Sequence, residues 1–151
     1  MSSAPVATAS SQAVTPALEA RLRSAGLRVT APRLAVLAAL ERCSGHPDVA
    51  AVAEAARGIA GSLSIQATYD ILAAFAAAGL VRRTEPAGHP ARFELRVADN
   101  HHHMICRSCG DIQDVDCVVA AAPCLDPPDS AGFVIDEAEV TYWGLCPACR
   151  T

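Results

Sequence analysis

The chain has 151 residues, 52% of them hydrophobic and 4% aromatic, and a formal net charge of −4. That length allows one ordinary domain or two small ones with a real buried core. The acidic total by itself argues against a nucleic-acid-binding protein, and the longest apolar run, residues 71–81, is far too short to span a membrane.

The charge is divided unevenly along the chain. Residues 1–97 carry ten Arg and seven acidic residues, a net charge of +3, whereas residues 98–151 carry two Arg and nine acidic residues, a net charge of −7. This asymmetry indicates a basic module that meets a polyanion and an acidic module with another role. We therefore expect domains at 17–97 and 98–151, behind a flexible tail at 1–16.

The tail is rich in Ser, Ala, Thr and Pro and carries no charged side chain. A secretory signal would need a positively charged start followed by an apolar run, and neither is present. The sequence therefore predicts a cytoplasmic protein, in which the seven cysteines are thiols or metal ligands and not disulfides.

The next part of the chain carries the signals of four helices and a hairpin. The helical segments are 15–27, 30–43, 48–59 and 64–80, and the last one is capped by Ser64. Two strand-like runs, 80–85 and 91–97, follow and are joined by a turn rich in Pro and Gly, in which His89 is expected to be solvated. This is the layout of a winged helix-turn-helix, in which 64–79 would be the recognition helix and the hairpin the wing.

Beyond Asp99 the chain holds only short strand candidates, among them 132–140. Roughly fifty residues cannot build a sufficient core alone, so this part needs a metal, a partner chain or both. A C-x2-C pair lies near each end of it, and four thiolates complete a tetrahedral zinc site. The sequence therefore predicts one structural zinc ion bound by Cys106, Cys109, Cys146 and Cys149.

Other interpretations of these cysteines fit less well. Two unrelated C-x2-C pairs, one of them redox-active, would require the βαβ context of a thioredoxin-type motif, which is absent. A zinc deaminase needs H-x-E followed by P-C-x2-C, and neither motif is present. An H-x3-C-x2-C redox motif can be laid on His102, Cys106 and Cys109, but it would need a helix there.

Three cysteines lie outside the C-x2-C pairs. Free Cys is among the most buried residue types, so for Cys43 we expect core packing. Cys117 and Cys124 flank a short apolar stretch near an acidic run, which makes them a candidate redox pair.

A run of three histidines precedes the first cysteine pair. Side chains alternate along a strand, so His101 and His103 share one face while His102 points away. Two imidazoles on one face bind a divalent ion when carboxylates join them, and Glu94 and Asp114 are the nearby acids.

Together these residues resemble the ferric uptake regulator superfamily of metal-dependent repressors. The resemblance runs from about Leu18 to Cys149 and rests on GLRVTAPR, AGLVRR, RFEL, HHHMICRSCG and YWGLCPAC. The stretches DNHHH, DVDC, APCL and DEAEV are most similar to the actinobacterial FurA-type branch, which represses catalase-peroxidase genes. The resemblance implies an α+β fold, with a winged-helix DNA-binding domain at 17–97 and a small α/β, zinc-containing dimerisation domain at 98–151.

The resemblance also implies a regulatory metal site built from His46, Glu94, His101, His103 and Asp114. By itself His46 would be interpreted as a helix-boundary residue, so its role as a ligand comes from the family. The mixed N and O donors suit Fe(II) or Mn(II), with Zn(II) as a further candidate. Glu94 is typical of the iron-sensing branch and Asp114 of the peroxide-sensing branch, so we expect a mixed sensor that leans to peroxide.

For DNA contacts the resemblance implies Arg28, Arg33, Gln66 and Tyr69, the first two mainly to the backbone or minor groove. Asp70 stands where relatives commonly carry Arg, and its charge would repel phosphate. The second N/O metal site of many relatives is not expected here, because its positions correspond to Asn100, His102, Ala121 and Ala138, and only His102 is a good ligand.

The sequence-based hypothesis is a homodimeric, metal-dependent and redox-responsive repressor that binds palindromic double-stranded operator DNA. It would control catalase-peroxidase and other oxidative-stress genes, or iron-homeostasis genes, with no membrane or small organic partner. The alternative is a zinc-ribbon thiol redox switch that acts by binding another protein. An enzyme is disfavoured, because no open metal position is paired with a general base.

Overall fold

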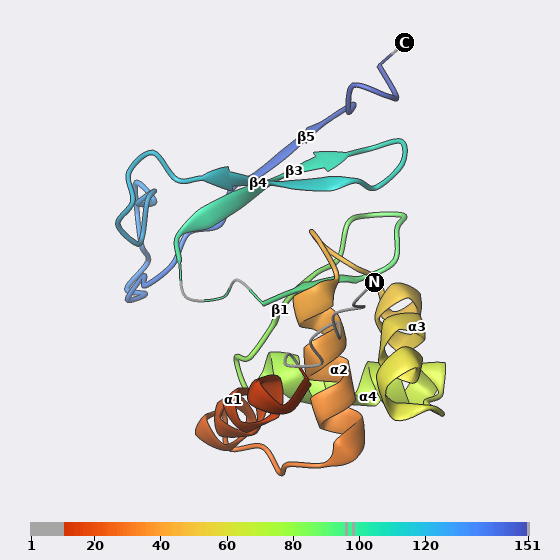
Figure 1. The fold of residues 1–151 in the computed structure, drawn as a ribbon. Coiled ribbons are helices and arrows are strands. Elements are labelled where there is room, and N and C mark those ends of the chain that lie inside the picture. The colour runs from red at the N-terminus through yellow and green to blue at the C-terminus, as the bar shows by residue number, and fades with distance from the viewer. Residues whose placement is uncertain (1–10, 96, 98, 151) are drawn as a thin grey trace, which may run out of the picture.

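The computed structural model describes residues 11–95, 97 and 99–150, which form a helical part and a separate three-stranded sheet (Figure 1). The helical part contains α1 (Ser11–Ser24), α2 (Ala31–Arg42), α3 (Val49–Ala60) and α4 (Ile65–Ala77). A short hairpin follows, made of β1 (Arg82–Thr84) and β2 (Arg92–Glu94). The sheet contains β3 (His101–Cys106), β4 (Ile112–Asp116) and β5 (Thr141–Gly144).

Side-chain caps set the starts of three helices. Each cap oxygen accepts the main-chain N–H three residues on, at 3.4 Å for Thr30, 2.9 Å for Asp48 and 3.0 Å for Ser64. These bonds satisfy amide groups that have no partner within the helix, which is why the helices begin there. The predicted starts of the second, third and fourth helices are confirmed.

The first helix differs from the prediction at its start. It begins at Ser11, so residues 11–16 of the expected tail are helical, and Pro16 lies inside the helix. A proline inside a helix removes one main-chain donor, which lowers the stability of the turn that precedes it. Residues 1–10 of the expected tail lie outside the described residues.

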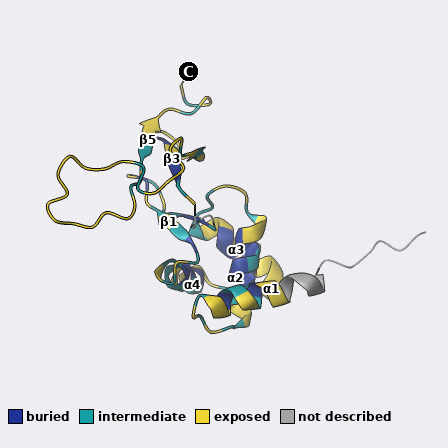
Figure 2. Ribbon diagram, turned by 90° about the vertical axis from the view of Figure 1, so that its left-hand side faces the viewer, coloured by how far each residue is buried: buried dark blue, intermediate teal, exposed yellow. Residues whose placement is uncertain are grey.

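The hydrophobic core lies where the helices meet the hairpin, and Figure 2 shows the buried residues gathered along the helices that face one another. Its largest fully buried side chains include Leu22, Leu37, Leu72, Phe75 and Phe93. A helical unit backed by a β-hairpin is the layout expected of a winged helix-turn-helix. The α+β fold class is therefore confirmed.

The sheet has the strand order β4-β3-β5, so β3 lies in the middle. β4 runs antiparallel to β3, with Asp114 opposite His103, and β5 runs parallel to β3, with Gly144 opposite Cys106. Parallel strands end at the same edge of a sheet. The turns that follow β3 and β5 are therefore neighbours.

The segment 132–140 has no strand, although its sequence predicts one. It belongs to the long connection from 117 to 140, most of which is exposed (Figure 2). Val134 is 96% exposed. Phe133 is also mostly exposed, so these two apolar side chains are not buried in the single chain and the tertiary context overrides the pattern.

The turn between β1 and β2 packs against the turn that follows β3. His89 Nε2 lies 3.4 Å from the carbonyl oxygen of Arg107, and the ring of His89 covers Gly110. A Cβ atom at position 110 would lie 2.6 Å from that ring, and the φ of +73° also favours glycine. His89 is therefore half-buried and forms a contact between the helical part and the sheet, which the expectation of a solvated turn residue did not include.

No single helix among the described residues is long and apolar enough to cross a membrane. Within the described part of the chain, α3 and α4 reach that length and composition only when taken together, and the chain bends by 103° between them.

Candidate metal centres

The two C-x2-C turns come together at one end of the sheet. All four sulfur atoms lie within 4.8 Å of one another, and Cys109 Sγ and Cys146 Sγ are 3.7 Å apart. Zinc–sulfur bonds of about 2.3 Å in a tetrahedron separate the sulfurs by roughly 3.8 Å, so the spacing fits zinc. We term this group the cysteine cluster: Cys106, Cys109, Cys146 and Cys149.

Main-chain donors and crowding shape the electrostatics of the cysteine cluster. The N–H groups of Cys109 and Cys146 lower the pKa of the Cys106 thiol to about 6. The N–H of Asp111 favours the thiolate of Cys109, but the neighbouring Cys106 and Cys146 outweigh it and raise the pKa of Cys109 to about 12. Four thiolates this close repel one another, so a bound cation is what would let all four ionise.

The residues predicted to hold the regulatory metal come from four places in the chain and meet between the helical part and the sheet. His46 lies between α2 and α3, Glu94 ends β2, His101 and His103 lie on β3, and Asp114 lies on β4. We term these five residues the histidine cluster.

The carboxylate of Glu94 lies in the middle of the histidine cluster. Its oxygens are 3.1 Å from His46 Nε2, 3.2 Å from His101 Nε2 and 3.0 Å from His103 Nε2. Asp114 Oδ1 is 3.0, 3.8 and 3.7 Å from the same three nitrogens. The side chains of the three histidines and Glu94 are almost fully buried, whereas the side chain of Asp114 is 32% exposed.

Two observations show that these residues fit a metal ion. His46 Nε2 is buried beside two carboxylate oxygens, yet it forms no hydrogen bond with either. On the outer side, His101 Nδ1 lies 2.8 Å from Asp99 and His103 Nδ1 lies 3.4 Å from Glu139. The hydrogen bond to Asp99 keeps the ring proton of His101 on Nδ1 and leaves the lone pair of its Nε2 free for a metal.

The charges of the histidine cluster also suit a divalent ion. Burial opposes the ionisation of Glu94, but His103 and His46 outweigh it and hold the pKa of this carboxyl well below its usual range. The hydrogen bond to Glu94 raises the pKa of His103. Two carboxylates and three imidazoles are a donor set that Fe(II), Mn(II) and Zn(II) all accept.

His102 faces away from the histidine cluster, as strand alternation predicts, and meets other donor atoms there. Its Nε2 lies 3.3 Å from Cys124 Sγ, and Cys117 Sγ lies within 4.8 Å of both atoms. The sequence singles out the two cysteines but gives no sign that His102 joins them. That juxtaposition depends on the path of the connection after β4.

The candidate DNA contacts lie on the helical part. Arg28, Gln66 and Tyr69 are exposed and Arg33 is half-buried. The Arg33 guanidinium donates to the carbonyl oxygen of Arg28 at 2.9 Å, so these two residues lie together at the start of α2. On α4 the Gln66 amide donates to the Asp70 carboxylate at 2.8 Å, which gives this acid a partner within its own helix.

The chain matches the Ferric uptake regulator family over residues 24–141. It is 56% identical to the "Transcriptional regulator FurA" of Mycobacterium tuberculosis, over 85% of this chain and 87% of that protein. It is 30% identical to the "Peroxide operon regulator" of Bacillus subtilis, over 85% of this chain and 88% of that protein.

Solved structures have a similar fold. The ferric uptake regulator of Pseudomonas aeruginosa with manganese matches with a TM-score of 0.68 and 26% identity, over 86% of this chain and 98% of that one. The ferric uptake regulator of Vibrio cholerae matches with a TM-score of 0.66 and 25% identity, over 85% of this chain and 98% of that one.

Proposed function

The chain belongs to the ferric uptake regulator family and is a FurA-type transcriptional regulator, not an enzyme, and on this premise we propose how it acts. In this proposal it is a homodimeric repressor that binds palindromic operator DNA when a divalent ion occupies the histidine cluster. A repressor acts where the chromosome lies, so the protein works in the cytoplasm.

One observation carries this proposal: the histidine cluster spans the two parts of the chain. His46 and Glu94 belong to the helical part, whereas His101, His103 and Asp114 belong to the sheet. A bound divalent ion would supply the positive charge that offsets the two carboxylates and favours the joined arrangement. Coupling of about 1–3 kcal/mol between metal and DNA is enough to change operator occupancy strongly.

Fe(II) or Mn(II) is the regulatory ion in this proposal, with Zn(II) as a competitor, and Zn(II) on the cysteine cluster has a structural role. The cysteine cluster joins the ends of β3 and β5, so its integrity sets the geometry of the strand that carries His101 and His103. Four thiolates leave no open position for chemistry, which suits a structural ion.

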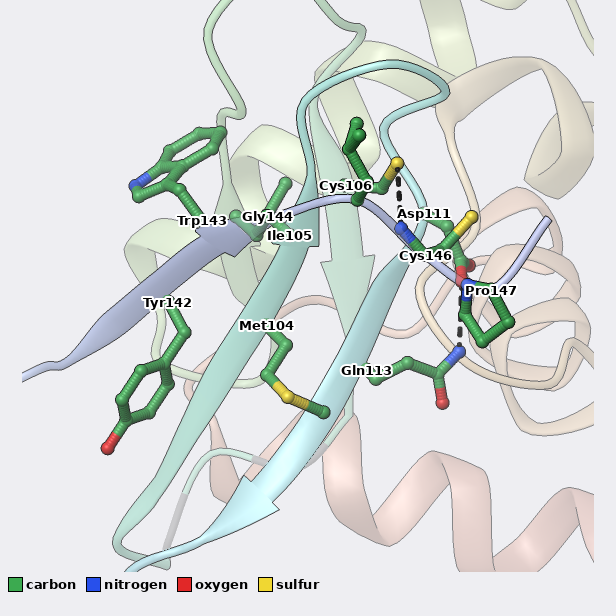
Figure 3. Close-up of a pocket in the computed structure, with 11 residues that line it drawn as sticks. Met104, Ile105, Cys106, Asp111, Gln113, Tyr142, Trp143, Gly144, Cys146 and Pro147 are labelled. Carbon is green, nitrogen blue, oxygen red and sulfur yellow. Dashed lines mark hydrogen bonds between the residues drawn. The ribbon is translucent and has the colours of Figure 1, made fainter. Parts of the chain in front are cut away.

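We expect the homodimer contact on the exposed face of the sheet near β5. A groove of about 640 Å³ lies there, and Met104, Tyr142, Trp143 and Leu145 are among its lining residues (Figure 3). These four side chains are exposed, and β5 pairs on one edge only among the described strands. A second copy would cover the apolar groove and the open edge together.

For operator recognition, α4 enters the major groove and the hairpin of β1 and β2 is the wing. Gln66 and Tyr69 on α4 read or position the duplex, while Arg28 and Arg33 contact its backbone or minor groove. Arg83 of β1 lies 5.5 Å over the Tyr69 ring, which links the wing to the recognition helix.

The proposed signal is peroxide, and the proposed targets are catalase-peroxidase and other oxidative-stress genes, or iron-homeostasis genes. Asp114 and the 30% identity to a peroxide operon regulator support this choice. Fe(II) in the histidine cluster would supply one-electron chemistry with peroxide. His46 and His101 are the ring side chains that would be oxidised.

Operator binding by the zinc-loaded full chain tests the proposal. A duplex selected from a random library by the Mn(II)-loaded protein serves as the operator, and fluorescence anisotropy measures its affinity with and without Mn(II). We expect Mn(II) to raise the affinity by about tenfold or more. Glu94→Gln should abolish this response, because it removes the carboxylate that contacts all three histidines.

Glu54→Gln is the matched control, because Glu54 is exposed on α3, lies outside the histidine cluster and should leave the response intact. The proposal is wrong if the Glu94 variant still requires Mn(II). The affinity must also fall steeply with salt, as phosphate contacts require. Binding that ignores both metal and salt would favour the alternative, a zinc-ribbon thiol switch that binds a protein.

A further inference from the structure

The side of β3 opposite to the histidine cluster carries a group of nucleophilic side chains that the proposed repression does not use. His102 is buried, with 4% of its surface exposed, and its Nε2 lies 3.3 Å from Cys124 Sγ. Cys117 Sγ lies within 4.8 Å of both atoms, and both cysteines are half-buried. We term Cys117 and Cys124 the thiol pair.

The main-chain partner of His102 decides what this group can do. Its Nδ1 accepts a hydrogen bond from the N–H of Val140 at 3.2 Å. In a neutral imidazole the proton must then be on Nε2, which donates it toward Cys124 Sγ. In His101 the arrangement is the opposite, because a carboxylate lies beside Nδ1. A carboxylate at Nδ1 holds the ring proton there and leaves Nε2 free for a metal. In this arrangement His102 donates to a thiol.

The two thiols differ in their surroundings. Burial opposes the ionisation of Cys117, but the N–H groups of Val119 and Ala120 and the neighbouring Cys124 outweigh it and lower the pKa of this thiol. Burial and the neighbouring Cys117 raise the pKa of Cys124. Cys117 is therefore the nucleophile of the pair, and Cys124 is the second thiol, which reacts after it.

We infer that the thiol pair is a site of two-electron oxidation by hydroperoxides, independent of any metal in the histidine cluster, with His102 as its positioning residue. The Cys117 thiolate attacks the hydroperoxide, so that the O–O bond breaks, the sulfur keeps one oxygen as a sulfenic acid and an alcohol or water leaves. Cys124 then attacks that sulfur with loss of water, and a Cys117–Cys124 disulfide remains. The Nε2–H of His102 stabilises the Cys124 thiolate during this second step.

The experiment uses the full chain with zinc bound and Mn(II) in place of Fe(II), so that iron chemistry is excluded. The protein receives one equivalent of hydrogen peroxide, and alkylation followed by peptide mass mapping locates the oxidised residues. We expect a Cys117–Cys124 disulfide with unchanged zinc content, also in Cys43→Ser, which is the matched control. Oxidation that begins at the cysteine cluster, or that leaves the thiol pair reduced, would overturn the inference.

Variants separate the steps. Cys124→Ser should leave a sulfenic acid on Cys117 that reacts with dimedone, whereas Cys117→Ser should give no adduct at Cys124. His102→Leu should slow disulfide closure by about tenfold, the size expected for loss of a hydrogen bond to a charged group. His102→Gln keeps an N–H donor near the position of Nε2 and should restore most of the rate, which a purely structural role for His102 would not produce.

Zinc analysis tests whether His102 and the thiol pair bind a metal ion instead. If the wild-type chain holds about two zinc ions and Cys124→Ser loses one of them, the three side chains form a metal site and the dithiol inference is wrong. These measurements need no DNA, so their failure would leave the proposed operator binding untouched.

Discussion

Three consecutive histidines on β3 have two kinds of environment because of the partners that their rings meet. The rings of His101 and His103 have carboxylates beside Nδ1, and their Nε2 atoms point to Glu94. His102 has a main-chain donor at Nδ1 and a sulfur at Nε2. The residue type alone therefore predicts little, and the proton position in each ring decides its role.

The pKa shifts of two thiols predict how their reactivity depends on pH. Only the thiolate reacts, so Cys117, whose pKa is lowered, should still be alkylated by iodoacetamide below the ordinary thiol pKa of about 8.5. Burial raises the pKa of Cys43, so its alkylation should appear only at higher pH. Peptide mass spectrometry across a pH series checks the order, and equal profiles would contradict it.

The cysteine cluster predicts a stoichiometry. Cys146→Ser should lose about one zinc per chain and expose the sheet to proteolysis, because the turns after β3 and β5 would no longer be joined. Metal analysis after mild chelation measures the loss, with Cys43→Ser as the control that keeps the ion. Unchanged zinc in Cys146→Ser would rule out the shared site.

At the scale of elements, the sequence predicts best where local chemistry decides the structure. Thr30, Asp48 and Ser64 cap helices that begin where their side chains indicate. The prediction of a strand at 132–140 fails because most of this segment is exposed and has no strand beside it among the described residues. Its pattern of apolar residues predicts that one face of the segment is buried, but it does not identify the element that covers this face.

The cap of α4 predicts a small, local effect. Ser64→Ala removes the oxygen that accepts the Ala67 N–H at 3.0 Å and should lower the free energy of unfolding by about 1 kcal/mol. Urea denaturation of the zinc-loaded protein measures it. Ser62→Ala, at an exposed position just before the helix, should change stability by less than about 0.5 kcal/mol.

The contact between the wing turn and the turn after β3 predicts a coupling. Gly110→Ala adds a Cβ atom 2.6 Å from the His89 ring at a φ of +73°, so it should destabilise the protein by about 1 kcal/mol or more. Part of this loss should disappear in a His89→Ala background, where the ring is gone. A double-mutant cycle measures the difference, and fully additive losses would mean that the two turns do not press on each other.

At the scale of the whole molecule, the sequence predicts the chemistry of the sites better than their position. Strand alternation places His101 and His103 on one face, and the C-x2-C spacing brings the thiols together. The join between His46 and the sheet depends on tertiary contacts that no local pattern contains, and only the resemblance to a family indicated it. The meeting of His102 with Cys124 was missed for the same reason.

The exposed groove predicts the oligomeric state. Trp143→Glu places a charge in the proposed dimer contact and should convert the dimer to a monomer, as measured by light scattering. Ile59→Glu on α3 is the matched control, because Ile59 is 39% exposed and Trp143 38%. A dimer that survives Trp143→Glu would require a different contact face.

The placement of β3 between β4 and β5 has a consequence for errors in folding. Side chains on a strand repeat every two residues, so a slip of β3 by one position would turn every one of them over. His102 would then face Asp114, while His101 and His103 would meet the thiol pair, and neither site would keep its chemistry. Cys106 ends this strand and belongs to the cysteine cluster. Zinc bound there would therefore fix the pairing register of β3, and with it the side of the sheet on which each histidine lies.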